Sequence, residues 1–84
     1  MFVLAIGTFT DPSKLAPYAE AEIASLHAHK AAGTVVNAYQ RVDGKGVAVI
    51  WRVASLAEAR ERVGQLLFSQ HGLMTVELTE LAEL

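Results

Sequence analysis

The sequence predicts an α+β sandwich, in which a four-stranded antiparallel sheet carries two helices on one of its faces. Two observations predict it. Apolar stretches rich in β-branched residues alternate with Ala- and Glu-rich stretches of helical periodicity, and together they follow the order βαββαβ. A chain of 84 residues, of which 52% are hydrophobic, has room for one globular domain, which we place at residues 1–84.

The first half of the pattern is a strand followed by a helix. Residues 2–9 are apolar and partly β-branched, and an Asp-Pro turn at residues 11–12 follows them, which predicts a strand. Pro17 is tolerated in the first turn of a helix, because its missing N–H would be unpaired there anyway. Good helix formers continue to Ala32, and Gly33 suits the left-handed position that ends a helix.

A hairpin is predicted next, with strands at residues 34–42 and 47–53. The loop Asp43-Gly44-Lys45-Gly46 separates them. Its glycines can adopt the positive φ angles that tight hairpin turns need. The two strands are therefore expected to pair antiparallel.

The remaining chain predicts a second helix and a fourth strand. Ser55 and Glu58 form a capping box, in which the hydroxyl and the carboxylate each accept from an unpaired N–H at the helix start. We expect the helix from Leu56 to about Phe68 and the strand over residues 73–81. Right-handed crossovers place the first and third strands side by side at the centre, with both helices on one face, which is the ferredoxin-like sandwich.

Both faces of this sheet are expected to be apolar. On the first strand, one face carries Phe2, Leu4 and Ile6, and the other carries Val3, Ala5 and Phe9. Two helices cover only one face, and soluble monomers rarely expose an apolar patch larger than roughly a few hundred Å². We therefore expect a homodimer or a higher homo-oligomer, in which two sheets pack face to face as a dimeric α/β barrel.

Composition and charge argue against several classes of partner and site. The net charge is −2 and the seven Lys and Arg residues are scattered, which argues against nucleic acid. No apolar run reaches the roughly 18 residues of a membrane span, so no membrane partner is expected. The lack of cysteine excludes thiolate metal sites and fits a cytoplasmic protein. No metal-ligand set and no phosphate-binding loop is visible, so we expect neither a metal nor a cofactor.

Four stretches of the chain carry a resemblance to a known family. They read "AAGTVVNAYQR", "DGKG", "VASLAEAR" and "QLLFSQHGLMTVELTEL", and with Glu22 they cover roughly residues 20–81. The chain resembles the muconolactone delta-isomerase-like family of the dimeric α/β-barrel superfamily and, less specifically, YCII-related proteins. It departs from the family pattern at Leu67 and Glu80, where prolines are usual.

The resemblance implies a function and a site. The true isomerases move a proton on a lactone ring, and a small-molecule pocket would lie between the sheet, the first helix and the partner subunit. The family's helix carboxylate matches Glu22, and its aromatic position on the second strand matches Tyr39. Residues 34–37, which read Thr-Val-Val-Asn, replace a more basic stretch of the isomerases.

Helical geometry independently supports Glu22 as a site residue. It also places two conspicuous histidines on different sides of the helix. Ala19, Ile23, Leu26 and Lys30 recur at helical spacing and form the predicted apolar stripe of the first helix. At ~100° per residue, Glu22 lies about 60° from the centre of this stripe, at its boundary, where a carboxylate could reach a pocket. A desolvated Glu has a raised pKa and can act as a base, although an ordinary solvated glutamate is the alternative. His27 and His29 point about 200° apart, so they cannot share a metal ion. His29 lies on the Glu22 side and is the one that could join a site.

Five further residues are candidates, each with an ordinary alternative. Tyr39 and Trp51 could line a pocket for a flat substrate, or could pack in a dimer core. Arg41 could anchor an anion, or could be solvated at the strand end or form an ion pair at an interface. Asn37 could donate to an oxyanion, or could bond a neighbouring backbone group. His71, in the loop before the last strand, could act as an acid or base, or could simply be solvated.

Three functions remain open from the sequence. The first is a cofactor-free isomerase or related proton-transfer enzyme acting on a small ring or carbonyl compound, with Glu22 as base. The second is a cofactor-free monooxygenase of aromatic or polyketide compounds, for which Trp51 and His71 would matter more. The third is a non-catalytic binding or assembly module, whose interior would be packed without a ligand-sized pocket.

Overall fold

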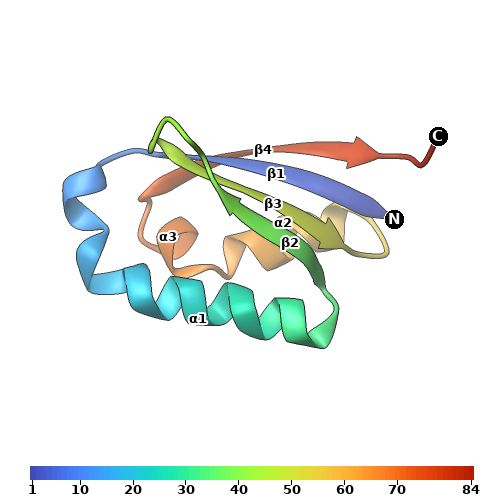
Figure 1. The fold of residues 1–84 in the computed structure, drawn as a ribbon, viewed down its shortest axis with the longest axis horizontal. Helices are drawn as coiled ribbons and strands as arrows, with labels where there is room; N and C mark the ends of the chain where they lie inside the picture. The colour runs from blue at the N-terminus through green and yellow to red at the C-terminus, as the bar shows by residue number, and fades with distance from the viewer.

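The computed structural model describes residues 1–84 and has the ferredoxin-like βαββαβ fold (Figure 1). Its elements are β1 (Phe2–Phe9), the 3-10 turn η1 (Pro12–Lys14), α1 (Ala16–Ala32), β2 (Val35–Gln40), β3 (Gly46–Arg52), α2 (Leu56–Gly64), α3 (Leu67–Gln70) and β4 (Met74–Leu81). The strands form one antiparallel sheet in the order β2-β3-β1-β4, as predicted. The helices lie on one side of the sheet. No helix combines the length and the apolar character needed to cross a membrane.

The predicted ends of α1 and the start of α2 are confirmed. Gly33 follows α1 with φ 84°, and its N–H and that of Thr34 bond back to the carbonyls of the last turn. At the start of α2, the Ser55 hydroxyl accepts from the Glu58 N–H at 3.1 Å. The Glu58 carboxylate accepts from the N–H of Ala54 at 2.7 Å, one residue earlier than the usual capping box.

The second strand is shorter than predicted. It ends at Gln40, because the N–H of Arg41 bonds the carbonyl of Gly46 and the N–H of Gly44 bonds the carbonyl of Arg41. These bonds form the turn that joins β2 to β3. A bulge at Val36 shifts the register of β2 near its start.

The prediction of one continuous second helix over residues 56–68 was wrong. The helix α2 ends at Gly64, and Leu66 adopts an extended conformation (φ −66°, ψ 144°) before α3 begins at Leu67. Glycine is a weak helix former, and the break turns the Leu66 side chain into the core, where it is 4% exposed. The Glu22 side chain of α1 caps the start of α3.

The core lies between the sheet and the helices. Its most deeply buried large side chains are Trp51, Val3 and Val35, which come from β3, β1 and β2. Leu26 of α1 and Ala59 of α2 cover them from the helical side. The helix-covered face of the sheet therefore forms the packed interior.

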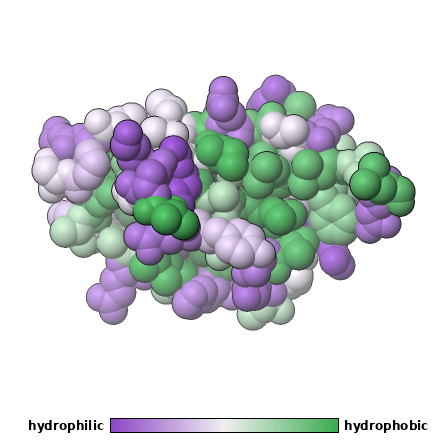
Figure 2. Space-filling view, turned by 45° about the horizontal axis from the view of Figure 1, so that its top comes forward, coloured by the Kyte–Doolittle hydropathy of each residue, from purple (hydrophilic) through white to green (hydrophobic).

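The opposite face of the sheet has no covering element. Phe2, Leu4 and Ile6 of β1 and Ile50 of β3 lie on this side in register and are half-buried by their neighbours alone. Figure 2 shows apolar side chains gathered across it. Both faces of the central strands are thus apolar, as predicted.

Candidate small-molecule site

Glu22 is the one charged side chain that the fold buries. It lies on α1 and is 3% exposed. Its Oε1 accepts from the backbone N–H of Leu67 at 3.0 Å, and its Oε2 accepts from that of Phe68 at 3.2 Å. The carboxylate therefore caps the first turn of α3, whose N–H groups would otherwise be unpaired. No Lys, Arg or His forms an ion pair with it.

Burial raises the pKa of Glu22 above its ordinary value. The backbone N–H groups of Phe68 and Leu67 favour the charged form and oppose this shift without cancelling it. A carboxylate with a raised pKa is a stronger base than an exposed one. Burial thus shifts the pKa of Glu22 in the direction that a base at this position would require.

Glu22 lines a small cavity between the sheet and the helices, which we call the inner cavity. Its volume is about 60 Å³. Its wall consists of Ala5, Gly7, Glu22, Ile23, Leu26, Val47, Val49, Trp51, Val63, Leu66, Phe68, Met74 and Val76. Trp51 is fully buried there, and its Nε1–H has no hydrogen-bond partner. Glu22 and Trp51 are therefore the two residues with polar side-chain groups in the wall of an otherwise apolar cavity.

A larger hollow adjoins the inner cavity. This outer hollow has a volume of about 430 Å³ and is lined by Phe9, Leu15, Ala19, Ile23, Leu26, His27, Ala38, Tyr39, Gln40, Val47 and Phe68. It shares Ile23, Leu26, Val47 and Phe68 with the inner cavity. Its size falls within the range of roughly 300–1,000 Å³ that is typical of ligand pockets. The two spaces are therefore neighbours, and we call the pair the joined cavities.

Gly7 provides room in the inner cavity, and sequence reasoning did not identify it. It lies in β1 opposite Val47, and a Cβ at this position would collide with the Sδ of Met74 and crowd Val47. The available signal was a glycine inside a strand, where it often marks a close approach. Sequence reasoning also missed Met74, because nothing local distinguishes it from an ordinary core residue.

His29 packs against the ring of Trp51. Its ring is 5.1 Å from the Trp51 ring in an edge-on arrangement, and its Nδ1 lies 2.9 Å from the Thr34 hydroxyl. Burial, and then the nearby charge of Arg62, lowers the pKa of His29. The residue does not line either cavity. It supports the Trp51 ring.

Tyr39 and Asn37 are joined on the edge strand β2. The Asn37 Nδ2 donates to the Tyr39 hydroxyl at 2.9 Å, and its Oδ1 accepts from Lys30 at 3.1 Å and from the N–H of Ala38 at 3.0 Å. Tyr39 lines the outer hollow and is 52% exposed. Asn37 lines neither cavity, and its hydrogen bonds hold Tyr39.

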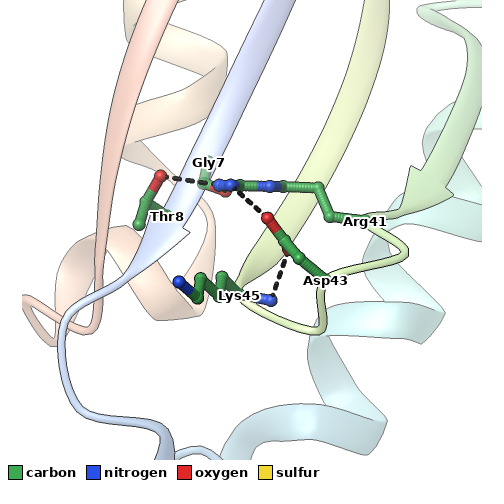
Figure 3. Close-up of polar contacts among 5 residues, drawn as sticks. All are labelled: Gly7, Thr8, Arg41, Asp43 and Lys45. Atoms are coloured by element: carbon green, nitrogen blue, oxygen red, sulfur yellow. Dashed lines mark hydrogen bonds and ion pairs between the residues drawn. The ribbon is translucent and has the colours of Figure 1, made fainter.

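Arg41 makes polar contacts at the hairpin (Figure 3). It lines neither cavity. Its Nη1 donates to the Thr8 hydroxyl at 2.9 Å and to the carbonyl of Gly7 at 3.4 Å, and its Nη2 lies 2.7 Å from Asp43. The N–H of Lys45, and then Arg41, hold the pKa of Asp43 below its ordinary value. Arg41 is thus held by an ion pair within its own hairpin, which sequence reasoning did not identify.

His71 lies outside both cavities. It is exposed, and its ring stacks on Tyr18 at 4.2 Å. Together with Lys14 it lines a separate surface hollow of about 410 Å³. Nowhere in residues 1–84 do three His, Asp or Glu side chains converge as a metal site would require. The structure thus brings Glu22 and Trp51 together, with Tyr39 at the adjoining hollow, and leaves His71 elsewhere.

Comparison with known proteins identifies a structural relative. No protein-family model and no curated protein sequence matches the chain. Among solved structures, 5-chloro-2-hydroxyhydroquinone dehydrochlorinase from Burkholderia phenoliruptrix AC1100, in complex with 2,5-dihydroxybenzoquinone, superimposes with a TM-score of 0.82. The match covers 98% of this chain and 94% of that chain at 18% sequence identity. At this identity the similarity shows a shared fold.

Proposed function

We propose that the protein binds a small ring or carbonyl compound in the joined cavities and transfers a proton on it without a cofactor, with Glu22 as base. The observation that carries this proposal is a buried carboxylate, without a cationic partner, in the wall of an otherwise apolar cavity. The resemblance to muconolactone delta-isomerase-like proteins favours an isomerase within this class.

The chemistry needs only groups that this chain supplies. Two backbone N–H groups fix the orientation of the Glu22 carboxylate, and its remaining lone pairs stay free to accept a proton. In an isomerisation, Glu22 would take a proton from the carbon beside a carbonyl and return it to another carbon of the same conjugated system. The carbon–carbon double bond moves, no electrons are gained or lost, and Glu22 is regenerated.

The structural relative supports a ligand of this kind. It is a dehydrochlorinase, and its complex contains a quinone with a single ring. Loss of HCl and isomerisation share one requirement, which is a group that accepts a proton from the substrate. A common fold with a base facing the helix-covered side of the sheet would serve either reaction.

A non-catalytic binding module is the second candidate, and one observation favours it. The hydrogen bonds from Leu67 and Phe68 already give the Glu22 carboxylate a structural role as the cap of α3. The outer hollow would then bind a ligand without transforming it. The monooxygenase alternative is less well supported, because His71 lies outside the cavity that Trp51 lines.

We also propose that two copies form a cytoplasmic homodimer through the open face of the sheet, each copy being a single domain. The apolar side chains on that face come from the central strands and have no covering element. Pairing two such faces would remove them from water at about 25 cal/mol per Å². The joined cavities lie on the opposite side and would stay available to a ligand.

Isomerisation of α-angelica lactone to its conjugated isomer tests the enzyme proposal. This lactone is small and uncharged, and its reaction moves one proton between ring carbons. We expect the wild type to catalyse it and Glu22→Gln to be at least about 100-fold slower, the lower range for loss of a general base. Glu20→Gln, on the exposed side of the same helix, is the matched control. Equal rates for wild type and Glu22→Gln would leave the binding module as the better description.

A further inference from the structure

The joined cavities contain an unusual pair of polar groups. The Trp51 Nε1–H is buried without a partner, and buried N–H groups in native proteins nearly always have one. Trp51 and Glu22 both line the inner cavity, and the Glu22 carboxylate is an acceptor when ionised. A ligand group that accepts from the indole N–H beside Glu22 would satisfy the donor that the protein leaves unpaired.

No Lys or Arg side chain is available to a ligand in this region, and His27 at the outer hollow is the one lining residue that could carry a positive charge. Neither the inner cavity nor the outer hollow is lined by Lys or Arg. Arg41 is bound to Asp43 and Thr8, and Lys30 donates to Asn37. An anionic ligand would lose its hydration without a compensating charge from Lys or Arg, and the Glu22 carboxylate would repel it.

The dimensions of the two spaces limit the shape of the ligand. The inner cavity, about 60 Å³, has room for one small substituent, because water itself occupies about 30 Å³ in the liquid. The outer hollow, about 430 Å³ and lined largely by apolar side chains, has room for a ring. The wall at Gly7 and Met74 sets one boundary of the inner cavity.

We infer that the ligand is an uncharged single-ring compound, whose carbonyl oxygen enters the inner cavity and accepts from the Trp51 N–H beside Glu22. Its ring occupies the outer hollow. This inference rests on the proposed function and narrows the substrate class to neutral compounds. Carboxylate-bearing lactones are disfavoured, because Glu22 would repel them and no Lys or Arg lines either space.

Three probes of nearly identical shape test the inference. Benzamide, benzoate and benzamidinium differ mainly in charge, which is neutral, negative and positive. The chain has a single Trp, so one indole N–H signal in a proton–nitrogen NMR spectrum reports on the inner cavity. We expect benzamide to move this signal downfield and to bind at least tenfold more tightly than either ion. Tighter binding of benzoate or benzamidinium, or an unmoved indole signal under saturating benzamide, would overturn the inference.

Two variants locate the binding. Trp51→Phe removes the N–H and keeps a ring, and we expect calorimetry to show benzamide affinity reduced about tenfold. Gly7→Ala fills part of the inner cavity and should abolish the indole shift, whereas Gly64→Ala is the matched control because its added Cβ meets no atom within 4 Å. If Gly7→Ala fails to fold, Trp51→Phe decides alone. Unchanged affinity in folded Trp51→Phe would contradict the inference.

This experiment separates the inference from the proposed function. Preference for benzamide without any lactone isomerisation would retain the ligand class and remove the enzyme. Lactone isomerisation that depends on Glu22, combined with tighter binding of benzoate, would retain the enzyme and overturn the ligand class.

Discussion

The two faces of the sheet are built from the same strands, but only one of them is covered by helices and contains a cavity. The helix-covered face carries Trp51 and Val49 and contains the inner cavity, with Glu22 in its wall. The open face carries Leu4 and Ile50, which pair in register and have no covering element. Both faces are apolar, so hydrophobicity alone does not distinguish a site from an interface. A buried carboxylate, an unpaired donor and a glycine that leaves room distinguish the covered face, where we propose that the ligand binds.

Trp51→Ala should cause the largest loss of stability, because Trp51 is fully buried on the covered face. Removing a buried aromatic side chain costs about 3–5 kcal/mol. Ile50→Ala, one residue away on the open face, should cost less than half as much in dilute protein. Urea denaturation of both variants measures the difference, and equal losses would contradict the assignment of the core to one face.

Ile50→Lys should change assembly more than fold. A charge in the centre of the open face would be buried unpaired between two sheets, so we expect the dimer dissociation constant to rise at least about 100-fold. Light scattering after size exclusion, with Ala57→Lys on the exposed surface of α2 as control, measures it. A wild type that is monomeric at micromolar concentration would refute the proposed dimer.

Glu22→Gln should have a smaller, pH-dependent effect on stability. Since folding raises the pKa of Glu22 above 4.5, the folded protein holds this proton more tightly than the unfolded chain does. The resulting stability is present at low pH and is lost as the pH rises through the folded pKa.

The wild type should therefore lose stability relative to Glu22→Gln as the pH rises from about 4 toward neutrality. Denaturation curves across that range measure the effect, and Glu20→Gln corrects for removing a carboxylate from α1. A stability difference that grows in favour of the wild type with rising pH would contradict the raised pKa.

Sequence predicted the elements whose signals are local. The glycine after α1, the Ser55 cap of α2 and the loop of the hairpin are each read from a few adjacent residues, and the βαββαβ order followed from them. The break before α3 could not be predicted in this way. Glu22, which caps the start of α3, is 45 residues from Leu67 in the chain, and no local sequence pattern connects the two residues.

The same distinction applies to the candidate site. Helical spacing singled out Glu22 but misplaced the buried side of the helix. The predicted stripe included Ile23, which is 54% exposed, whereas Glu22, predicted at its boundary, is 3% exposed. Alternation along the strand grouped Trp51 with Val49 but could not tell which face the helices cover. Spacing could not show that Arg41 reaches across to Thr8 of β1, or that His71 stacks on Tyr18 away from Glu22. Those contacts depend on how the sheet edge and the α3 loop pack, which is a property of the whole fold.

Carbon-13 NMR titration of the Glu22 carboxyl, assigned by comparison with Glu22→Gln, measures directly whether the covered face contains a base. A carboxylate that burial makes basic should titrate with a midpoint above the ordinary value of 4.5. A midpoint at or below 4.5 would mean that the N–H groups of Leu67 and Phe68 outweigh burial. Glu22 would then be the structural cap of α3 and would not act as a base.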